Sequence, residues 1–221
     1  MTTLLTINVT NRQPQTQEFY FFQQPTVFSG GSWAYSNSLY SQALGNYDQT
    51  GSLLTVQVGT QTFAAIQQAH GMPQVGQVSG YASATRAIDL ASSSGGTNDA
   101  TTAIVGPLGL AAPTFAPGVQ PGAFRITTPV YAPPEIYNIG SSVQVNGWTV
   151  LSSFVVANPA TITDCQPVLK FYVQTGTYIP GSVVNFTQSS VNAAVCDFTG
   201  GHSVINVTLN ADGTWTVQIV Q

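Results

Sequence analysis

Charged side chains are scarce in this sequence. Asp, Glu, Lys and Arg together make up 5% of its 221 residues, whereas about 25% is usual for globular domains. Serine, threonine, asparagine, glutamine, glycine and the backbone must therefore form most of the surface. Such a surface gives little electrostatic repulsion between molecules. The composition therefore favours self-association, or a neutral partner such as a glycan, over a charged partner.

Basic residues are the scarcest of the charged groups. The chain has only four, and its formal net charge is −4. Nucleic-acid binding needs clustered Lys and Arg side chains that displace counterions from phosphates, and a polybasic membrane contact needs a similar cluster. Four scattered cations exclude both classes of partner. They are Arg12, Arg86, Arg125 and Lys170.

Long apolar runs and a basic N-terminal region are also absent. A membrane-spanning helix needs about 18 or more consecutive apolar residues, and the segment AIVGPLGLAA at 103–112 is short and interrupted by glycine and proline. The N-terminal sequence MTTLLTINVTN is typical of a first strand rather than of a secretion signal. We therefore expect no membrane span, and a protein that is cytoplasmic or exported without a conventional signal.

The sequence has two cysteines, Cys165 and Cys196, and neither belongs to a C-x-x-C or Cys/His cluster. This spacing excludes a typical zinc site. The two residues are either reduced, buried thiols or a disulfide, which would stabilise the fold by roughly 3–4 kcal/mol in the chain-entropy model. The sequence leaves both alternatives open.

Groups for acid–base or nucleophilic catalysis are few. The two histidines, His70 and His202, each adjoin a glycine, and no G-x-S-x-G motif accompanies them. Glu18 and Glu135 are the two glutamates, but nothing in the sequence brings them together as a glycosidase pair would require. The sequence therefore favours a non-catalytic protein, with no catalytic residue, no metal ligand and no cofactor assigned.

Alternating apolar and polar residues predict β-strands at both ends of the chain. Aliphatic residues share one face in the segments 5–10 and 53–58. Asn146-Gly147 lies between two alternating runs and predicts a type I′ hairpin, and Asp212-Gly213 marks a second hairpin. In each hairpin a tryptophan stands on the aliphatic face, so we expect Trp148 and Trp215 in the core.

The middle of the chain has a different composition. Residues 67–134 are rich in Gly, Pro, Ala and Ser, and proline is confined to strand edges, turns and loops. We expect an irregular segment that packs its apolar side chains on the sheets, with short helices at 62–71 and 83–92. Residues 135–221 form the most regular β region. The predicted fold is a single all-β domain over 1–221, an antiparallel, jelly-roll-like β-sandwich.

The segment QEFYFFQQP at 17–25 places four aromatic rings in a row. In a strand, Phe19 and Phe21 share one face and Tyr20 and Phe22 share the other. We expect Phe19 and Phe21 in the core, and Tyr20 and Phe22 beneath the Pro-rich middle segment.

Aromatic residues are also dense between Pro25 and Tyr47, where they alternate with Ser, Asn, Gln and Gly. Aromatic rings stack on the C–H faces of sugars, and a mixture of Tyr, Ser, Gly and Asn is typical of protein-binding loops. Packing of this segment on its own sandwich is the alternative interpretation. The candidate ligand-binding residues are Phe28, Trp33, Tyr35, Asn37, Tyr40 and Tyr47.

The leading functional hypothesis is therefore a lectin-like protein that binds a neutral ligand, most of all a carbohydrate, through this segment. The first alternative is a structural or self-assembling protein, of the surface, capsid or inclusion type, that forms homo-oligomers through its uncharged surface. The second alternative is an enzyme that uses His70 or His202 with an acid.

Overall fold

The computed structural model describes residues 4–30 and 33–220 and shows an all-β protein, with 51% strand and 5% helix. Its larger sheet contains β1 (Leu4–Asn11), β2 (Gln17–Gln23), β4 (Tyr35–Leu44), β5 (Leu54–Gly59), β6 (Phe63–Ala69), β7 (Ala82–Ala87), β11 (Ile136–Val145), β12 (Trp148–Val156), β14 (Lys170–Thr175), β15 (Val183–Val184), β16 (Ala194–Asp197), β17 (Val204–Leu209) and β18 (Trp215–Val220). The smaller sheet contains β3 (Val27–Phe28), β8 (Ala100–Val105), β9 (Leu108–Leu110), β10 (Phe124–Thr127) and β13 (Ile162–Gln166). The two helices in the described part are α1 (Tyr47–Thr50) and α2 (Phe186–Val191).

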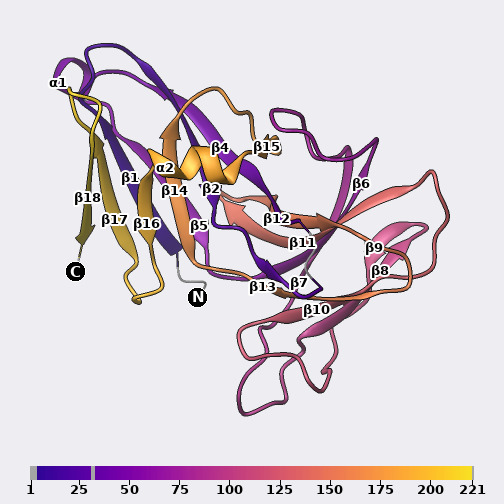
Figure 1. Ribbon diagram of the computed structural model, residues 1–221. Helices are drawn as coiled ribbons and strands as arrows, with labels where there is room; N and C mark the ends of the chain where they lie inside the picture. Colours follow the sequence, from indigo (N-terminus) through magenta and orange to yellow (C-terminus); the bar gives the residue numbers. More distant parts are fainter. Residues whose placement is uncertain (1–3, 31–32, 221) are drawn as a thin grey trace.

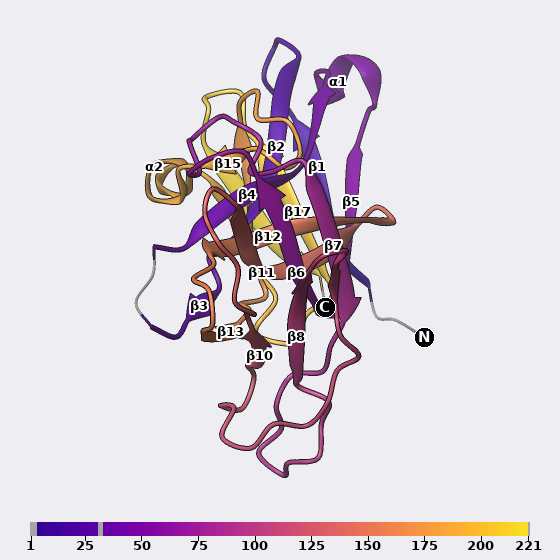
Figure 2. The same ribbon diagram turned by 90° about the vertical axis from the view of Figure 1, so that its right-hand side faces the viewer.

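The all-β prediction is confirmed, but both sheets are mixed rather than purely antiparallel. β1 pairs with β17 in parallel, and β8 pairs with β10 in parallel. The longest path through the larger sheet runs β16-β14-β2-β4-β12-β11-β5-β1-β17-β18 and curls into a nearly closed, barrel-like form. Figure 1 shows its end strands β16 and β18 near each other, and Figure 2 shows the smaller sheet at the opposite end of the molecule from α1.

The two largest apolar cores lie along this elongated arrangement. The first fills the barrel-like part and includes Ile7, Phe21 and Val207. The second lies between β6 and β11 of the larger sheet and the strands of the smaller sheet. β11 contributes to both, because Val143 and Val145 belong to the first core while its other end lies in the second.

The central segment contains more regular structure than its composition predicts, although most of its residues lie outside strands. Residues 67–134 include β7 to β10, and three of those strands build the smaller sheet. Both helix predictions are wrong, since 62–71 contains β6 and 83–92 contains most of β7. Six pairs of residues join β6 to β7, and seven join β6 to β11. Pairing on both sides outweighs the helix propensity of an alanine-rich segment, which is worth only tenths of a kcal/mol per residue.

The aromatic strand β2 is buried on both faces. Phe19 and Phe21 point into the first core, as expected. Tyr20 and Phe22 form a separate cluster on the other face. The segment 178–193 covers this cluster with Tyr178 and with Phe186, the first residue of α2. The expected cover by the Pro-rich middle segment is therefore wrong. The correct cover comes from residues more than 150 positions away, which no local pattern indicates.

Both predicted hairpins form. Val145 pairs with Trp148 beside a turn in which Asn146 and Gly147 have positive φ, and Leu209 pairs with Trp215. Trp148 is nevertheless 79% exposed, which contradicts its assignment to the core. Among the described residues, the Trp148 end of β12 has no second neighbouring strand, because β12 pairs with β4 only at Ser153 and Phe154. Trp215 is half-buried and packs edge-on against Phe19, which is closer to the expectation.

Opposite charges occupy paired positions on β14 and β16. The Lys170 Nζ lies 2.8 Å from the Asp197 carboxylate, and this contact, with hydrogen bonds from Thr199, lowers the pKa of Asp197 to about 2. The pKa of an unfolded aspartate is about 3.9. The ionised Asp197 therefore stabilises the fold above about pH 4, and this contribution is lost as the pH falls toward about 2.

We expect Asp197→Asn to lower the free energy of unfolding at neutral pH by less than about 1 kcal/mol, because the pair is partly solvent-exposed. Near pH 2 the variant and the native protein should be equally stable. Urea titrations at both pH values measure the difference, and a Lys170→Gln background, in which the same change should cost less, is the control. An equal cost at both pH values would contradict the lowered pKa.

Candidate functional site

The six sequence-predicted ligand residues lie in different surroundings. Phe28 is half-buried and packs against the second core. Tyr35 stacks on Phe154 with a centroid separation of 5.3 Å. Asn37 is fully buried, and its amide donates hydrogen bonds to the Ser79 hydroxyl and the Leu151 carbonyl. These contacts tie the three side chains to the fold.

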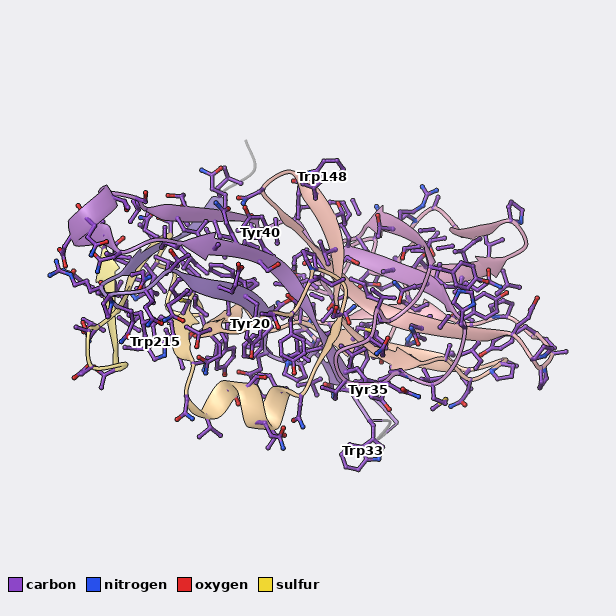
Figure 3. The ribbon with its side chains drawn as sticks, turned by 90° about the horizontal axis from the view of Figure 1, so that it is seen from above. Tyr20, Trp33, Tyr35, Tyr40, Trp148 and Trp215 are labelled. Carbon is purple, nitrogen blue, oxygen red and sulfur yellow. The ribbon has the colours of Figure 1, made fainter. Side chains whose placement is uncertain are left out.

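The other three candidate residues also lie in different parts of the structure. Tyr40 packs against the first core, and its hydroxyl donates a hydrogen bond to the Gln42 side chain. Tyr47 begins α1, beyond the end of β4. Trp33 is 87% exposed, and Figure 3 shows its ring projecting away from the sheets. Gly31 and Ser32 of this segment lie outside the described residues, and the described candidates do not form one continuous aromatic surface.

A more concave surface surrounds the connection between β6 and β7, residues 70–81. Part of this connection runs antiparallel to 181–183: the Gly76 N–H donates to the Val183 carbonyl at 2.8 Å, and the Val183 N–H donates to the Gln77 carbonyl at 2.8 Å. The Ser79 N–H also donates to the Gly181 carbonyl at 3.0 Å. The backbone therefore fixes this connection against a segment about 100 residues later.

Two clefts flank the connection, and together we name them the 70–81 clefts. The first has a volume of about 380 Å³ and contains the stacked rings of His70 and Tyr81, whose centroids are 4.1 Å apart. The second has a volume of about 410 Å³. The first is lined by His70, Gly71, Met72, Pro73, Gln74, Gln77, Val78, Ser79, Gly80 and Tyr81. The second is lined by Val75, Gly76, Thr177, Tyr178, Ile179 and Ser182.

Neither cleft contains an Asp, Glu, Lys or Arg side chain. Two other clefts differ in this respect. One, of about 270 Å³, contains Asp164, which forms a bidentate ion pair with Arg125. The other contains Asp89. The 70–81 clefts therefore offer an environment suited to an uncharged ligand.

Buried polar side chains lie beneath the 70–81 clefts. The Asn138 amide donates to the Ser79 carbonyl at 2.9 Å and to the Gln67 side chain at 3.1 Å. The hydroxyl of Ser182, a residue that is 1% exposed and lines the second cleft, has no hydrogen-bond partner among the described residues. Ser182 is therefore a buried polar group beneath the second cleft.

The groups that an enzyme would use are dispersed in the described part of the chain. No hydrogen bond or ion pair there joins His70 or His202 to a carboxylate. Three or more His, Cys, Asp or Glu side chains nowhere gather within residues 4–30 and 33–220 to hold a metal. Cys165 and Cys196 are free and buried in different cores, and burial raises the pKa of Cys196 to about 12.

Comparisons of the chain with protein-family models, with curated proteins and with solved structures found no match. In the part of the chain that the structure describes, no helix has the length and hydropathy needed to cross a membrane. Sequence reasoning missed the 70–81 clefts. The glycines and proline from Gly71 to Gly80 do indicate a loop, but they do not indicate that residues 177–182 lie beside it.

Proposed function

We propose that this protein is a non-catalytic binding protein for a neutral ligand, and that the ligand is a carbohydrate held in the 70–81 clefts. The observation that carries the proposal is the lining of these clefts: aromatic, amide and hydroxyl groups without an Asp, Glu, Lys or Arg side chain. Tyr81 offers an aromatic surface beside the side-chain amides of Gln74 and Gln77. Classification as a jelly-roll-like lectin remains a sequence-based prediction.

A glycan array followed by calorimetric titration tests this function. We expect Tyr81→Ala to weaken the binding of the best glycan about tenfold or more, because a stacking surface is removed. Gln77→Ala should weaken binding about two- to tenfold through the loss of one hydrogen bond, since Gln77 is an exposed amide residue of the first cleft. Tyr81 is half-exposed, so its truncation should leave the fold intact.

Trp33→Ala is the matched control, because Trp33 is a strongly exposed aromatic residue outside the clefts. Loss of binding in Trp33→Ala, with binding kept in Tyr81→Ala, would move the ligand to the sequence-predicted segment between Phe28 and Tyr47. Absence of any bound glycan at millimolar concentration would contradict carbohydrate binding at either place.

The second candidate function is self-assembly through the uncharged surface. The observation that favours it is the scarcity of charged side chains, 5% of the residues, which leaves little electrostatic repulsion between copies, together with large apolar side chains that are exposed to solvent. Light scattering at rising protein concentration tests this candidate, and a monodisperse monomer throughout would contradict it. The most exposed are Trp33, Met72, Val130, Trp148, Ile162 and Val191.

A further inference from the structure

The barrel-like part of the larger sheet has an open seam at β18. This strand pairs with β17 on one side and is the last strand of its path. β16, the strand at the other end of the path, approaches β18 without a pairing ladder in the described residues. The approach is held at the beginning of β18, where the Trp215 indole N–H donates to the Asn192 carbonyl at 2.8 Å.

The side chains of β18 show that the seam is uncovered. Val217 pairs with Val207, and Ile219 pairs with Ile205, so each pair shares one face of the sheet. Val207 and Ile205 are at most 1% exposed, whereas Val217 is 40% and Ile219 is 46% exposed. The core therefore continues across β17 but lacks a cover at β18. A further strand beside β18 would supply that cover.

The free edge of β18 has backbone N–H and C=O groups that such a strand could bind. The Asn210 N–H donates to the Thr214 carbonyl, which sets the phase of the β17–β18 ladder. Because antiparallel pairs alternate between bonded and non-bonded positions, the N–H and C=O groups of Val217 and Ile219 point away from β17. No backbone partner for them occurs among the described residues.

The free edge also lacks the features that normally protect an edge strand. Lysine, proline and inward-pointing charges block pairing at most sheet edges. Residues 214–220, TWTVQIV, contain none of them. The nearest charge in the sequence is Asp212 in the turn before β18.

We propose that β18 pairs antiparallel with β18 of a second copy of this chain, about a two-fold axis at Gln218. This inference rests on the self-assembly candidate and names its interface. With the axis at Gln218, Val217 of one copy lies opposite Ile219 of the other, and the outward backbone groups of both residues meet in a bonded pair. The four exposed aliphatic side chains then form one apolar strip.

A second copy fits this edge because the pairing is self-complementary. Antiparallel pairing places the two Asp212 carboxylates at opposite ends of the joined strands, whereas parallel pairing would place these like charges side by side. Neutral strand faces meet without burying a charge, which would cost free energy unless it were paired. An unrelated strand would need to match the same alternation and neutrality.

Cysteine cross-linking of the full chain tests the register. At a two-fold axis the Gln218 positions form a non-bonded pair whose Cα atoms lie about 4.5 Å apart, within the range for a disulfide. We expect Gln218→Cys to give a covalent dimer under mild oxidation. Thr216→Cys, which faces Val220 of the other copy, and Gln49→Cys on α1 should give only background dimer; the two native cysteines are buried.

Charged substitutions of Gln218, at the two-fold axis, provide a second test, in which light scattering measures association. Gln218→Lys and Gln218→Glu should each weaken association about two- to fivefold, since like charges then face each other. A mixture of the two variants should restore it, and Gln49→Lys should have no effect. If the native chain associates but Gln218→Cys does not cross-link above the controls, β18 pairing is wrong and self-assembly stands. If the native chain is monomeric throughout, both are wrong.

Discussion

Phe22→Ala is expected to lower the free energy of unfolding by about 3–5 kcal/mol. Phe22 is fully buried on the face of β2 that points away from the first core, which we call the outer face. Its ring stacks on Tyr172 at 5.2 Å and meets Phe186 edge-on at 6.0 Å. Truncation leaves a cavity among aromatic rings, and those rings can fill it only by leaving their mutual contacts. Chemical denaturation of the purified variant measures the loss.

Phe115→Ala is the matched control for this prediction. Phe115 is also a phenylalanine but is 52% exposed, so its truncation should change the free energy of unfolding by no more than about 0.5 kcal/mol. Phe22→Leu should cost less than Phe22→Ala because it leaves a smaller cavity. If Phe22→Ala were as mild as Phe115→Ala, the outer face of β2 would not be a packed core.

The Phe22 surroundings also show how much of the fold the sequence predicts. The positions of the rings in β2 correctly indicate two apolar faces, and the pattern in β1, β5 and β17 assigns the core face correctly. In the two hairpins, Trp148, Val217 and Ile219 lie on the predicted face but are exposed. These features depend on neighbouring residues in one strand or across one tight turn. What covers each face depends on distant segments, and α2 over Phe22 is one such case.

The candidate site illustrates the same limit. The buried position of Asn37 in β4 depends on acceptors from Ser79 and Leu151, which lie 42 and 114 positions away. A polar strand residue with no known partners is naturally interpreted as a surface residue, because burial without hydrogen bonds is costly. The core assignment of Trp148 is wrong for a related reason. Trp148 and Val145 share a face, but among the described residues only Val145 has a further neighbouring strand, β5, at Val58. Sequence alternation assigns faces, and the presence of the next layer decides burial.

Gly140→Ala adds one methyl group at the junction between the two cores and is expected to lower the free energy of unfolding by about 3 kcal/mol or more. Gly140 lies in β11 between Phe154 of β12 and Ala65 of β6. A Cβ at this position would lie 2.1 Å from the Ser153 carbonyl oxygen and 2.7 Å from the Phe154 Cα. Both obstructing atoms belong to the backbone, so no side-chain rotation relieves the clash.

The expected result is a variant that unfolds at much lower denaturant concentration or fails to accumulate as folded protein. Gly71→Ala is the control, because a Cβ there meets nothing within 4 Å and should leave stability almost unchanged. Since β11 carries residues of both cores, separation of β11 from β12 at Gly140 should destabilise both together. Exchange of the amide protons of β1 and β17 in the first core, and of β8 and β10 in the second core, reports the two parts separately. Loss of protection in one part with full retention in the other would show that the junction does not couple them.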